Sequence, residues 1–241
     1  MADKTNHLLP VIDLKGGTVV HGVAGKREHY QPVSSKLVDS ARPGEVAKAL
    51  IDKVTGNKCL YVADLDAIAG REPDRTGCAA IRDVGAAIWL DPGVVDVVAA
   101  RRCHKVIEFD RLIVALETLR SLRTLEQVVE AFSENQIVFS IDLVDRLPRT
   151  KDAAAGRLSA ETIASYAVDA GVRSLIVLDV TAVGSQQGGT TLDLCRKIRA
   201  RHPDIELVSG GGVRDWNDVG RFVDVGCDRV MVASALHAGA L

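Results

Sequence analysis

Eight short apolar segments, separated by longer segments of helical periodicity, constrain the fold of this chain more than any other feature. They are Leu8–Leu14, Cys59–Asp64, Ala87–Asp91, Arg111–Ala115, Ile137–Asp142, Ser174–Asp179, Ile205–Ser209 and Arg229–Ala233. Most are rich in Val, Ile and Leu without polar alternation, which is typical of strands buried on both faces of a parallel sheet. Between them, apolar residues recur at three- and four-residue steps in Gly44–Val54, Thr124–Phe132 and Ala160–Ala170. This alternation predicts an α/β fold, either a closed barrel or a doubly wound sheet.

An internal repeat favours the closed barrel. Four segments of the first half recur in the second half in the same order, at separations of 129, 115, 119 and 118 residues. Two similar four-strand halves suit a closed ring, because each half alone leaves open strand edges. We therefore predict one (β/α)8 barrel domain over residues 1–241, a length close to the roughly 250 residues of such barrels. Only Ser234–Leu241 follow the last predicted strand, so either the outer ring is incomplete there or a partner subunit of a homo-oligomer covers the gap.

The composition excludes several classes of function. The formal net charge is -2, aromatic residues make up 4% of the chain, and no run of five like charges occurs, which argues against a nucleic-acid partner. The five cysteines form no C-x-x-C pair, so we expect free thiols in a reducing cytosol and no zinc site. The segment Met1–Leu9 does not have the pattern of a signal peptide, and no apolar run approaches ~20 residues. We expect a cytoplasmic protein that acts on a small molecule.

Acidic residues recur at the predicted strand ends, where barrels of this kind carry their working residues. Asp13 and Asp142 occupy equivalent positions in the two halves, so we expect them to face each other across the barrel mouth. Opposed carboxylates can divide the roles of acid and base. Asp64 and Asp179 are candidates for contact with the substrate, and capping of the loops that follow them is an equally good interpretation.

The segment Val208–Val213, which reads Val-Ser-Gly-Gly-Gly-Val, predicts a phosphate-binding loop. It follows the seventh predicted strand and leads into a helix that starts near Asp215. Glycines at such a turn let backbone N–H groups approach a phosphate, and the loops after strands seven and eight are the usual phosphate site of these barrels. A plain tight turn is the alternative. The predicted phosphate-binding residues are Ser209, Gly210, Gly211, Gly212, Ala233, Ser234 and Gly188.

Three stretches in particular make the chain resemble the histidine-biosynthesis barrels, namely ProFAR isomerase and the cyclase subunit of imidazole glycerol phosphate synthase. They are Pro10–Val20, Leu60–Ala67 and Ser140–Leu143, and Val208–Val213 also matches. Lys15-Gly16-Gly17 favours the isomerase branch. The resemblance implies a ribulose-phosphate-binding type of barrel and an Amadori rearrangement of an aminoaldose to an aminoketose. It further implies that Asp13 removes the proton from sugar C2, that Asp142 opens the ring as an acid, and that no cofactor or metal is needed.

Departures from the family pattern indicate a changed substrate. The phosphate loop after strand three, normally Gly-Gly-Gly-Ile-Arg, is replaced by Asp91–Val95, and the Gly-Thr after strand four is replaced by Ala115–Leu116. After strand six, Leu178 and Val183–Ser185 replace a threonine and an Asp-Gly-Thr segment, and Val144–Leu158 contains no tryptophan to stack on an imidazole. We therefore expect a substrate with one phosphate. This altered pattern resembles isomerase-like paralogues encoded with one-carbon cofactor (methanopterin or methanofuran) genes.

Glu117 is a new acidic residue at the position after strand four. It either meets an amine or guanidine-like group of the substrate or provides a negative charge at the start of the next helix. Arg27, Tyr30 and Gln31 lie in the long loop after strand one and either close over the ligand or are solvated. Three hypotheses follow: a phosphosugar isomerase with an altered substrate, an ordinary ProFAR isomerase of histidine biosynthesis, and a non-catalytic barrel that binds a phosphate ligand.

Overall fold

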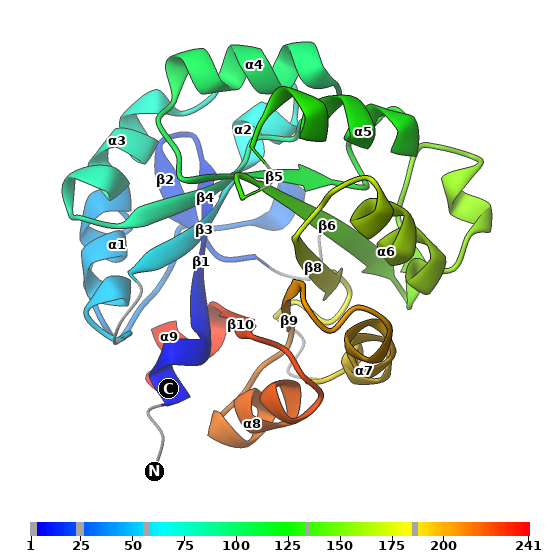
Figure 1. Ribbon diagram of the computed structural model, residues 1–241. Helices are drawn as coiled ribbons and strands as arrows, with labels where there is room; N and C mark the ends of the chain where they lie inside the picture. The colour runs from blue at the N-terminus through cyan, green and yellow to red at the C-terminus, as the bar shows by residue number, and fades with distance from the viewer. Residues whose placement is uncertain (1–3, 23–26, 55–57, 134, 185–187) are drawn as a thin grey trace.

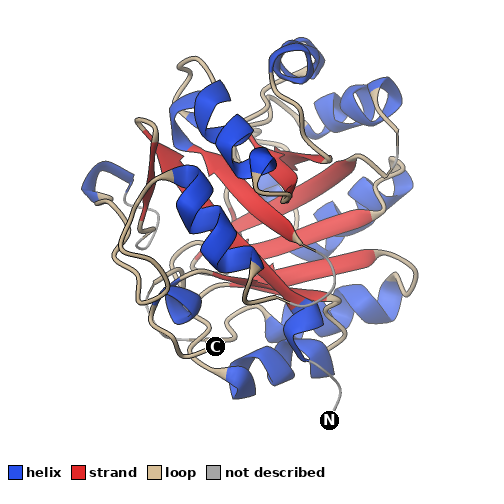
Figure 2. Ribbon diagram, turned by 90° about the vertical axis from the view of Figure 1, so that its left-hand side faces the viewer, coloured by secondary structure: helices blue, strands red, loops and turns tan. Residues whose placement is uncertain are grey.

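A closed ring of eight parallel strands forms the centre of the molecule (Figures 1 and 2). The computed structural model describes residues 4–22, 27–54, 58–133, 135–184 and 188–241. Strand β10 pairs with β1 in parallel and closes the ring, so the predicted (β/α)8 barrel is confirmed. Each strand overlaps one predicted apolar segment. In the order of the ring, the strands are β1 (Leu8–Lys15), β3 (Cys59–Asp64), β4 (Ala87–Asp91), β5 (Arg111–Ala115), β6 (Ile137–Val144), β8 (Ser174–Asp179), β9 (Glu206–Gly210) and β10 (Arg229–Val232).

Helices surround the ring, as Figure 1 shows. The longer ones are α1 (Pro43–Ile51), α3 (Arg75–Asp83), α4 (Val97–Val106), α5 (Leu122–Ala131), α6 (Ala160–Asp169), α7 (Leu192–Arg201) and α8 (Trp216–Asp224). The shorter elements are α2 (Leu65–Ile68), α9 (Ser234–His237) and the 3-10 turns η1 (Lys4–His7), η2 (Arg27–His29) and η3 (Ala155–Arg157). The helix that follows β10, α9, has four residues, so the layer of helices around the strands is incomplete at this position. This is one of the two outcomes expected from the short segment Ser234–Leu241.

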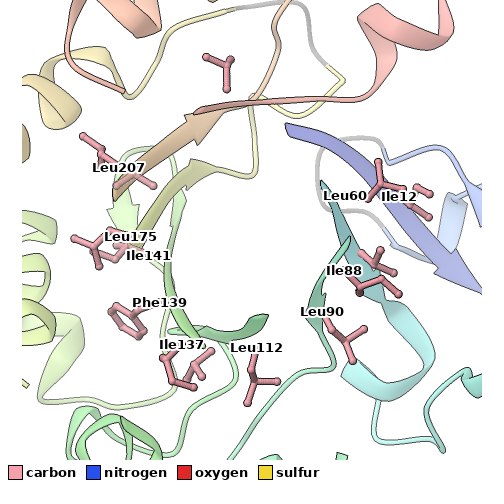
Figure 3. Packing of buried hydrophobic residues seen from close by; sticks show 14 of the residues in the cluster. Ile12, Leu60, Ile88, Leu90, Leu112, Ile137, Phe139, Ile141, Leu175 and Leu207 are labelled. Atoms are coloured by element: carbon pink, nitrogen blue, oxygen red, sulfur yellow. The ribbon is translucent and has the colours of Figure 1, made fainter. Parts of the chain in front are cut away.

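The barrel has two apolar layers, which explains why the strand sequences lack polar alternation. An outer layer lies between strands and helices, and Figure 3 shows Ile12, Leu60 and Leu207 on the outer face of the ring. An inner layer fills the barrel and includes Trp89 and Met231. Successive strand residues point to opposite sides, so both sets must be apolar when both sides are buried. The five cysteines are free and buried.

Two short antiparallel strands extend β1 and β6 at equivalent places in the two halves. Strand β2 (Thr18–Val20) returns along β1, and β7 (Leu147–Pro148) returns along β6. The first turn has Gly16 at φ 58° and Gly17 at φ 75°, and the second has Asp145 at φ 50° and Arg146 at φ 70°. Left-handed backbone at both turn residues is the mark of a type I′ hairpin. The duplication therefore includes these hairpins, which the strand pattern did not predict.

The N-terminal end of the barrel is closed by a polar cluster around Trp89. The guanidinium carbons of Arg111 and Arg229 lie 4.4 and 5.4 Å from the centre of the Trp89 rings. Glu206 forms an ion pair with each arginine, with 2.8 Å between its Oε1 and Nε of Arg229. At this end of such barrels side chains serve stability, so ligand binding belongs at the opposite end.

Candidate active site

A cavity of about 140 Å³ opens at the C-terminal ends of the strands. It brings together Asp13, Glu117 and Asp142 with Gly211, Gly212, Ala233 and Ser234, all of which the sequence singled out. Strands β1 and β6 lie four places apart in the ring of eight, so Asp13 and Asp142 approach the cavity from opposite sides. The cavity is also lined by Tyr61, Asp91 and Arg149.

Asp13 is half-buried beside a residue that leaves room for it. A Cβ added at Gly22 would stand 2.6 Å from Oδ2 of Asp13, so only glycine fits at position 22 without displacing the carboxylate. Among the described residues, none donates a hydrogen bond to the Asp13 carboxylate. Burial raises the pKa of Asp13 to about 7, and the positive charge of Arg27 opposes this shift. An unpaired carboxylate of this pKa can accept a proton near neutral pH.

Asp142 is 7% exposed, and among the described residues its carboxyl group accepts one hydrogen bond, donated to Oδ1 by the Ser140 hydroxyl at 3.1 Å. Its Oδ2 has no partner among the described residues. Burial, together with the negative charges of Glu117 and Asp91, raises the pKa of Asp142 to about 8. This carboxyl is therefore mainly protonated at neutral pH and can act as an acid.

Asp91 adds a third buried carboxyl at the end of β4. Its Oδ2 accepts a hydrogen bond from the Tyr61 hydroxyl at 3.0 Å, and its Oδ1 accepts one from the Gly93 backbone at 3.0 Å. Burial raises the pKa of Asp91 to about 6. Asp91 was not predicted as a site residue, because Asp91–Val95 was interpreted only as the replacement of a family phosphate loop.

Glu117 is held between two arginines. Nη2 of Arg27 lies 2.6 Å from its Oε1, and Nη1 of Arg149 lies 3.0 Å from its Oε2. Arg149 reaches this position because its backbone N–H donates to the Asp142 carbonyl at 2.7 Å as the β7 hairpin returns along β6. Arg149 was not predicted as a site residue, and it lies in Val144–Leu158, the loop that lacks the family tryptophan. Tyr30 also lines the cavity, whereas Gln31 does not.

The glycine loop contributes only part of its length to the cavity. Gly211 and Gly212 line it with φ of 91° and 69°, a conformation that favours glycine. Ser209 is fully buried, and its hydroxyl donates to the Val177 carbonyl at 2.7 Å. Gly210 packs against the backbone of Met231. Neither of these two residues lines the cavity.

The first turn of α8 is capped by its own chain. The Asp215 carboxylate accepts hydrogen bonds from the backbone N–H groups of Asn217 and Asp218 at 2.8 and 3.1 Å. The N–H groups at the start of this helix are therefore partly used, and Gly211 and Gly212, which precede it, line the cavity.

The other predicted site residues lie outside the cavity lining. Asp64 accepts three backbone hydrogen bonds, from Asp66, Ala67 and Asp74, which matches the capping interpretation. Asp179 accepts from the backbone N–H of Thr181 at 3.1 Å. A Cβ at Gly188 would lie 2.8 Å from the Asp218 carboxylate rather than in the cavity.

Within the described ranges, no group of three or more His, Cys, Asp or Glu side chains has the arrangement of a metal site. None of the helices that the structure describes has the length and apolar character needed to cross a membrane.

A family model described as histidine biosynthesis protein matches residues 7–241. The chain belongs to this family. The resemblance noted in the sequence is thereby confirmed. An uncharacterised protein of Methanocaldococcus jannaschii is 33% identical over 235 residues, covering 97% of this chain and 94% of its own. A ProFAR isomerase of Deinococcus radiodurans is 28% identical over 236 residues, covering 97% of this chain and 94% of its own. Another from Desulforudis audaxviator is 25% identical over 242 residues, with coverage of 97% and 87%.

Proposed function

We propose that this member of the histidine biosynthesis family is a divergent isomerase that uses Asp13 and Asp142 for acid–base chemistry on a sugar-like substrate with one phosphate. The observation that carries the proposal is that the two aspartates line one cavity from opposite strands, together with the backbone of Gly211 and Gly212. The isomerase names of several relatives support the class of reaction.

The two pKa values support a division of labour. With its pKa raised to about 8, Asp142 is the group that mainly carries a proton at neutral pH, and Asp13, with its pKa raised to about 7, is more often ionised and free to accept one. In an Amadori rearrangement, Asp142 gives its proton to the ring oxygen as the bond from that oxygen to C1 breaks and an iminium forms. Asp13 then takes the proton from C2, which gives an enaminol. Asp13 returns this proton to C1, and the C2 hydroxyl gives its proton to Asp142 as the carbonyl of the aminoketose forms, so both aspartates return to their starting states. Atoms and charge balance without a cofactor.

The charge around the cavity supports a substrate with a single phosphate. On the side of β9 and β10, the cavity offers Gly211, Gly212 and Ser234. On the side of β4 and β5, it offers Asp91, whose carboxylate would repel a second phosphate, and Glu117, which engages the nearby Arg27 and Arg149. The names of the isomerase relatives contain the phosphoribosyl group twice, so a substrate of their kind would place one phosphate beside these carboxylates.

Rescue of a histidine auxotroph separates this proposal from an ordinary ProFAR isomerase. We expect this gene not to restore growth without histidine, whereas a ProFAR isomerase gene in the same vector does. Growth comparable to that control would overturn the altered substrate.

A screen of monophosphorylated aldoses and aminoaldoses tests the catalytic roles. We expect turnover by the unmodified protein and a loss of at least about a hundredfold in Asp13→Asn and in Asp142→Asn, the usual size of a lost acid or base. Asp204→Asn, a change of the same charge at an exposed position outside the cavity, should keep full turnover. Binding of phosphate esters without any turnover would favour the non-catalytic barrel.

One-carbon cofactor biosynthesis is the pathway we hypothesise, and a gene deletion followed by measurement of methanopterin and methanofuran levels tests it.

A further inference from the structure

The barrel mouth has two chemically different ends. In the ring of strands, β4 lies opposite β9, and β5 lies opposite β10. The described residues after β9 and β10 that line the cavity carry no charge, and they are Gly211, Gly212, Val213, Ala233 and Ser234. The residues that face them from the ends of β4 and β5 are the carboxylates Asp91 and Glu117. Asp13 and Asp142 stand between these two ends, so a bound molecule that fills the cavity runs past both.

The arginines at the acidic end are already engaged. Both oxygens of Glu117 are used, one by Arg27 at 2.6 Å and one by Arg149 at 3.0 Å. Among the described residues, Asp13, Asp91 and Asp142 have no ion pair. Among the described residues, six charged groups line the cavity, two arginines and four carboxylates, which leaves an excess of negative charge when all ionise.

The carboxylates also have unused capacity for hydrogen bonds. Asp142 lines the cavity and is more than nine-tenths buried, and its Oδ2 has no hydrogen-bond partner in the described chain. Asp91, at 5% exposed, accepts one bond on each oxygen from Tyr61 and Gly93, and each carboxylate oxygen has a second lone pair. A buried carboxylate without a partner is costly, and a bound donor of positive charge would remove that cost.

We propose that the substrate carries a positively charged nitrogen group, an ammonium or amidinium, at the end that faces Asp91, opposite its phosphate. This inference rests on the proposed function, because it takes the phosphate at the Gly211–Gly212 end as given. The positive group takes the place of a second phosphate at this end, and it pairs with carboxylates that form no ion pair with any described residue. Asp91 is the residue that recognises it, since Glu117 is committed to the two arginines.

Pairs of alkyl phosphates that differ only at the far end test the inference. Isothermal titration at neutral pH would compare ω-aminoalkyl phosphates of two to six carbons with the ω-hydroxyalkyl phosphates of equal length, with α,ω-bisphosphates and with inorganic phosphate. We expect the best amino compound to bind at least about tenfold more tightly than its hydroxy partner, the effect of about 1.4 kcal/mol. Asp91→Asn should abolish this difference, so that the amino and hydroxy compounds of equal length bind the variant with the same affinity. The control Asp204→Asn should bind the amino and the hydroxy compounds with the affinities of the unmodified protein.

The outcomes distinguish the inference from the function on which it rests. Equal binding of amino and hydroxy compounds overturns the inference alone. Tighter binding of a bisphosphate than of every amino compound also overturns it, because Arg27 and Arg149 would then have left Glu117 for an anion. Failure of all these compounds, including inorganic phosphate, to bind overturns the proposed function and the inference with it.

Discussion

At the scale of single residues, the acidic groups of the barrel mouth are costly to the folded protein whenever they ionise. Asp13, Asp91 and Asp142 have pKa values raised to about 7, 6 and 8 by burial. In the unfolded chain the same groups ionise near the ordinary value of 3.8. Between those values the folded protein binds more protons than the unfolded chain, so stability falls as pH rises.

Replacing Asp142 by Asn should therefore stabilise the protein, and more so at alkaline pH. The gain in stability should be absent below about pH 4 and should grow until about pH 8. Over that range Asp142 ionises in the unfolded chain but stays protonated in the folded protein, which favours unfolding of the unmodified protein. We expect an unfolding midpoint several degrees above that of the unmodified protein at alkaline pH, at roughly 2–4 °C per kcal/mol. Thermal unfolding at about pH 5 and about pH 8.5 checks this. Asp204→Asn is the control, and a gain independent of pH would contradict the argument.

Gly22 is a second residue whose role is steric. Its substitution by Ala would put a Cβ 2.6 Å from the Asp13 carboxylate, which must then move. A shift of about 1 Å in a reacting group can cost on the order of a hundredfold in rate. We expect Gly22→Ala to lower kcat by at least tenfold and to leave the fold intact, measured on the substrate that the screen identifies. Gly156→Ala, whose Cβ would meet Thr150 at an ordinary 3.5 Å, is the matched control. Equal turnover of both variants would refute the role of Gly22.

At the scale of elements, the two hairpins that extend β1 and β6 are equivalent in backbone and different in sequence. The first turn uses Gly16 and Gly17, and the second places Asp145 and Arg146 in the same left-handed region. Aspartate tolerates this conformation, whereas arginine is strained in it by roughly 1 kcal/mol. The second hairpin nevertheless places Arg149 against Glu117, so its geometry matters to the site.

Arg146→Gly should relieve this strain. We expect the free energy of unfolding to rise by about 0.5 kcal/mol, the strain relieved less the greater freedom of glycine in the unfolded chain. Urea titration of the variant measures the change. The reciprocal substitution Gly17→Ala in the first hairpin should lower stability by about 1 kcal/mol. A loss of stability in Arg146→Gly would mean that the arginine side chain contributes contacts that exceed the strain.

At the scale of the whole molecule, the ring is divided between a stabilising end and a binding end. At the N-terminal end, Glu206 connects Arg111 of β5 with Arg229 of β10 across Trp89 of β4, so one carboxylate links strands from both halves. The two arginines, with Ser174, hold the pKa of Glu206 below its ordinary value against the effect of burial. The mouth at the other end contains Asp13, Asp142 and part of the glycine loop.

Glu206→Gln should destabilise the barrel without changing the mouth. The variant leaves two partly buried arginines without their anion, which we expect to cost about 1–3 kcal/mol. Urea titration measures the loss, and titration with a monophosphate should give an unchanged affinity. Glu108→Gln, which removes an exposed partner of Arg82, should cost less than about 0.5 kcal/mol. A weaker phosphate affinity in Glu206→Gln would show that the two ends are coupled.

Local patterns in the chain were enough to predict the barrel, its eight strands and the opposed aspartates. Buried strands show themselves as apolar runs, and the repeat places Asp13 and Asp142 at the same point of two halves. Only the tertiary structure determined which polar groups meet. It paired Glu117 with Arg27 and Arg149. It also directed the Ser209 hydroxyl to the Val177 carbonyl, away from the cavity lining, and placed Asp91 in that lining. These outcomes depend on the path of loops and hairpins across the mouth, which join residues far apart in the chain and leave no periodic signal in it.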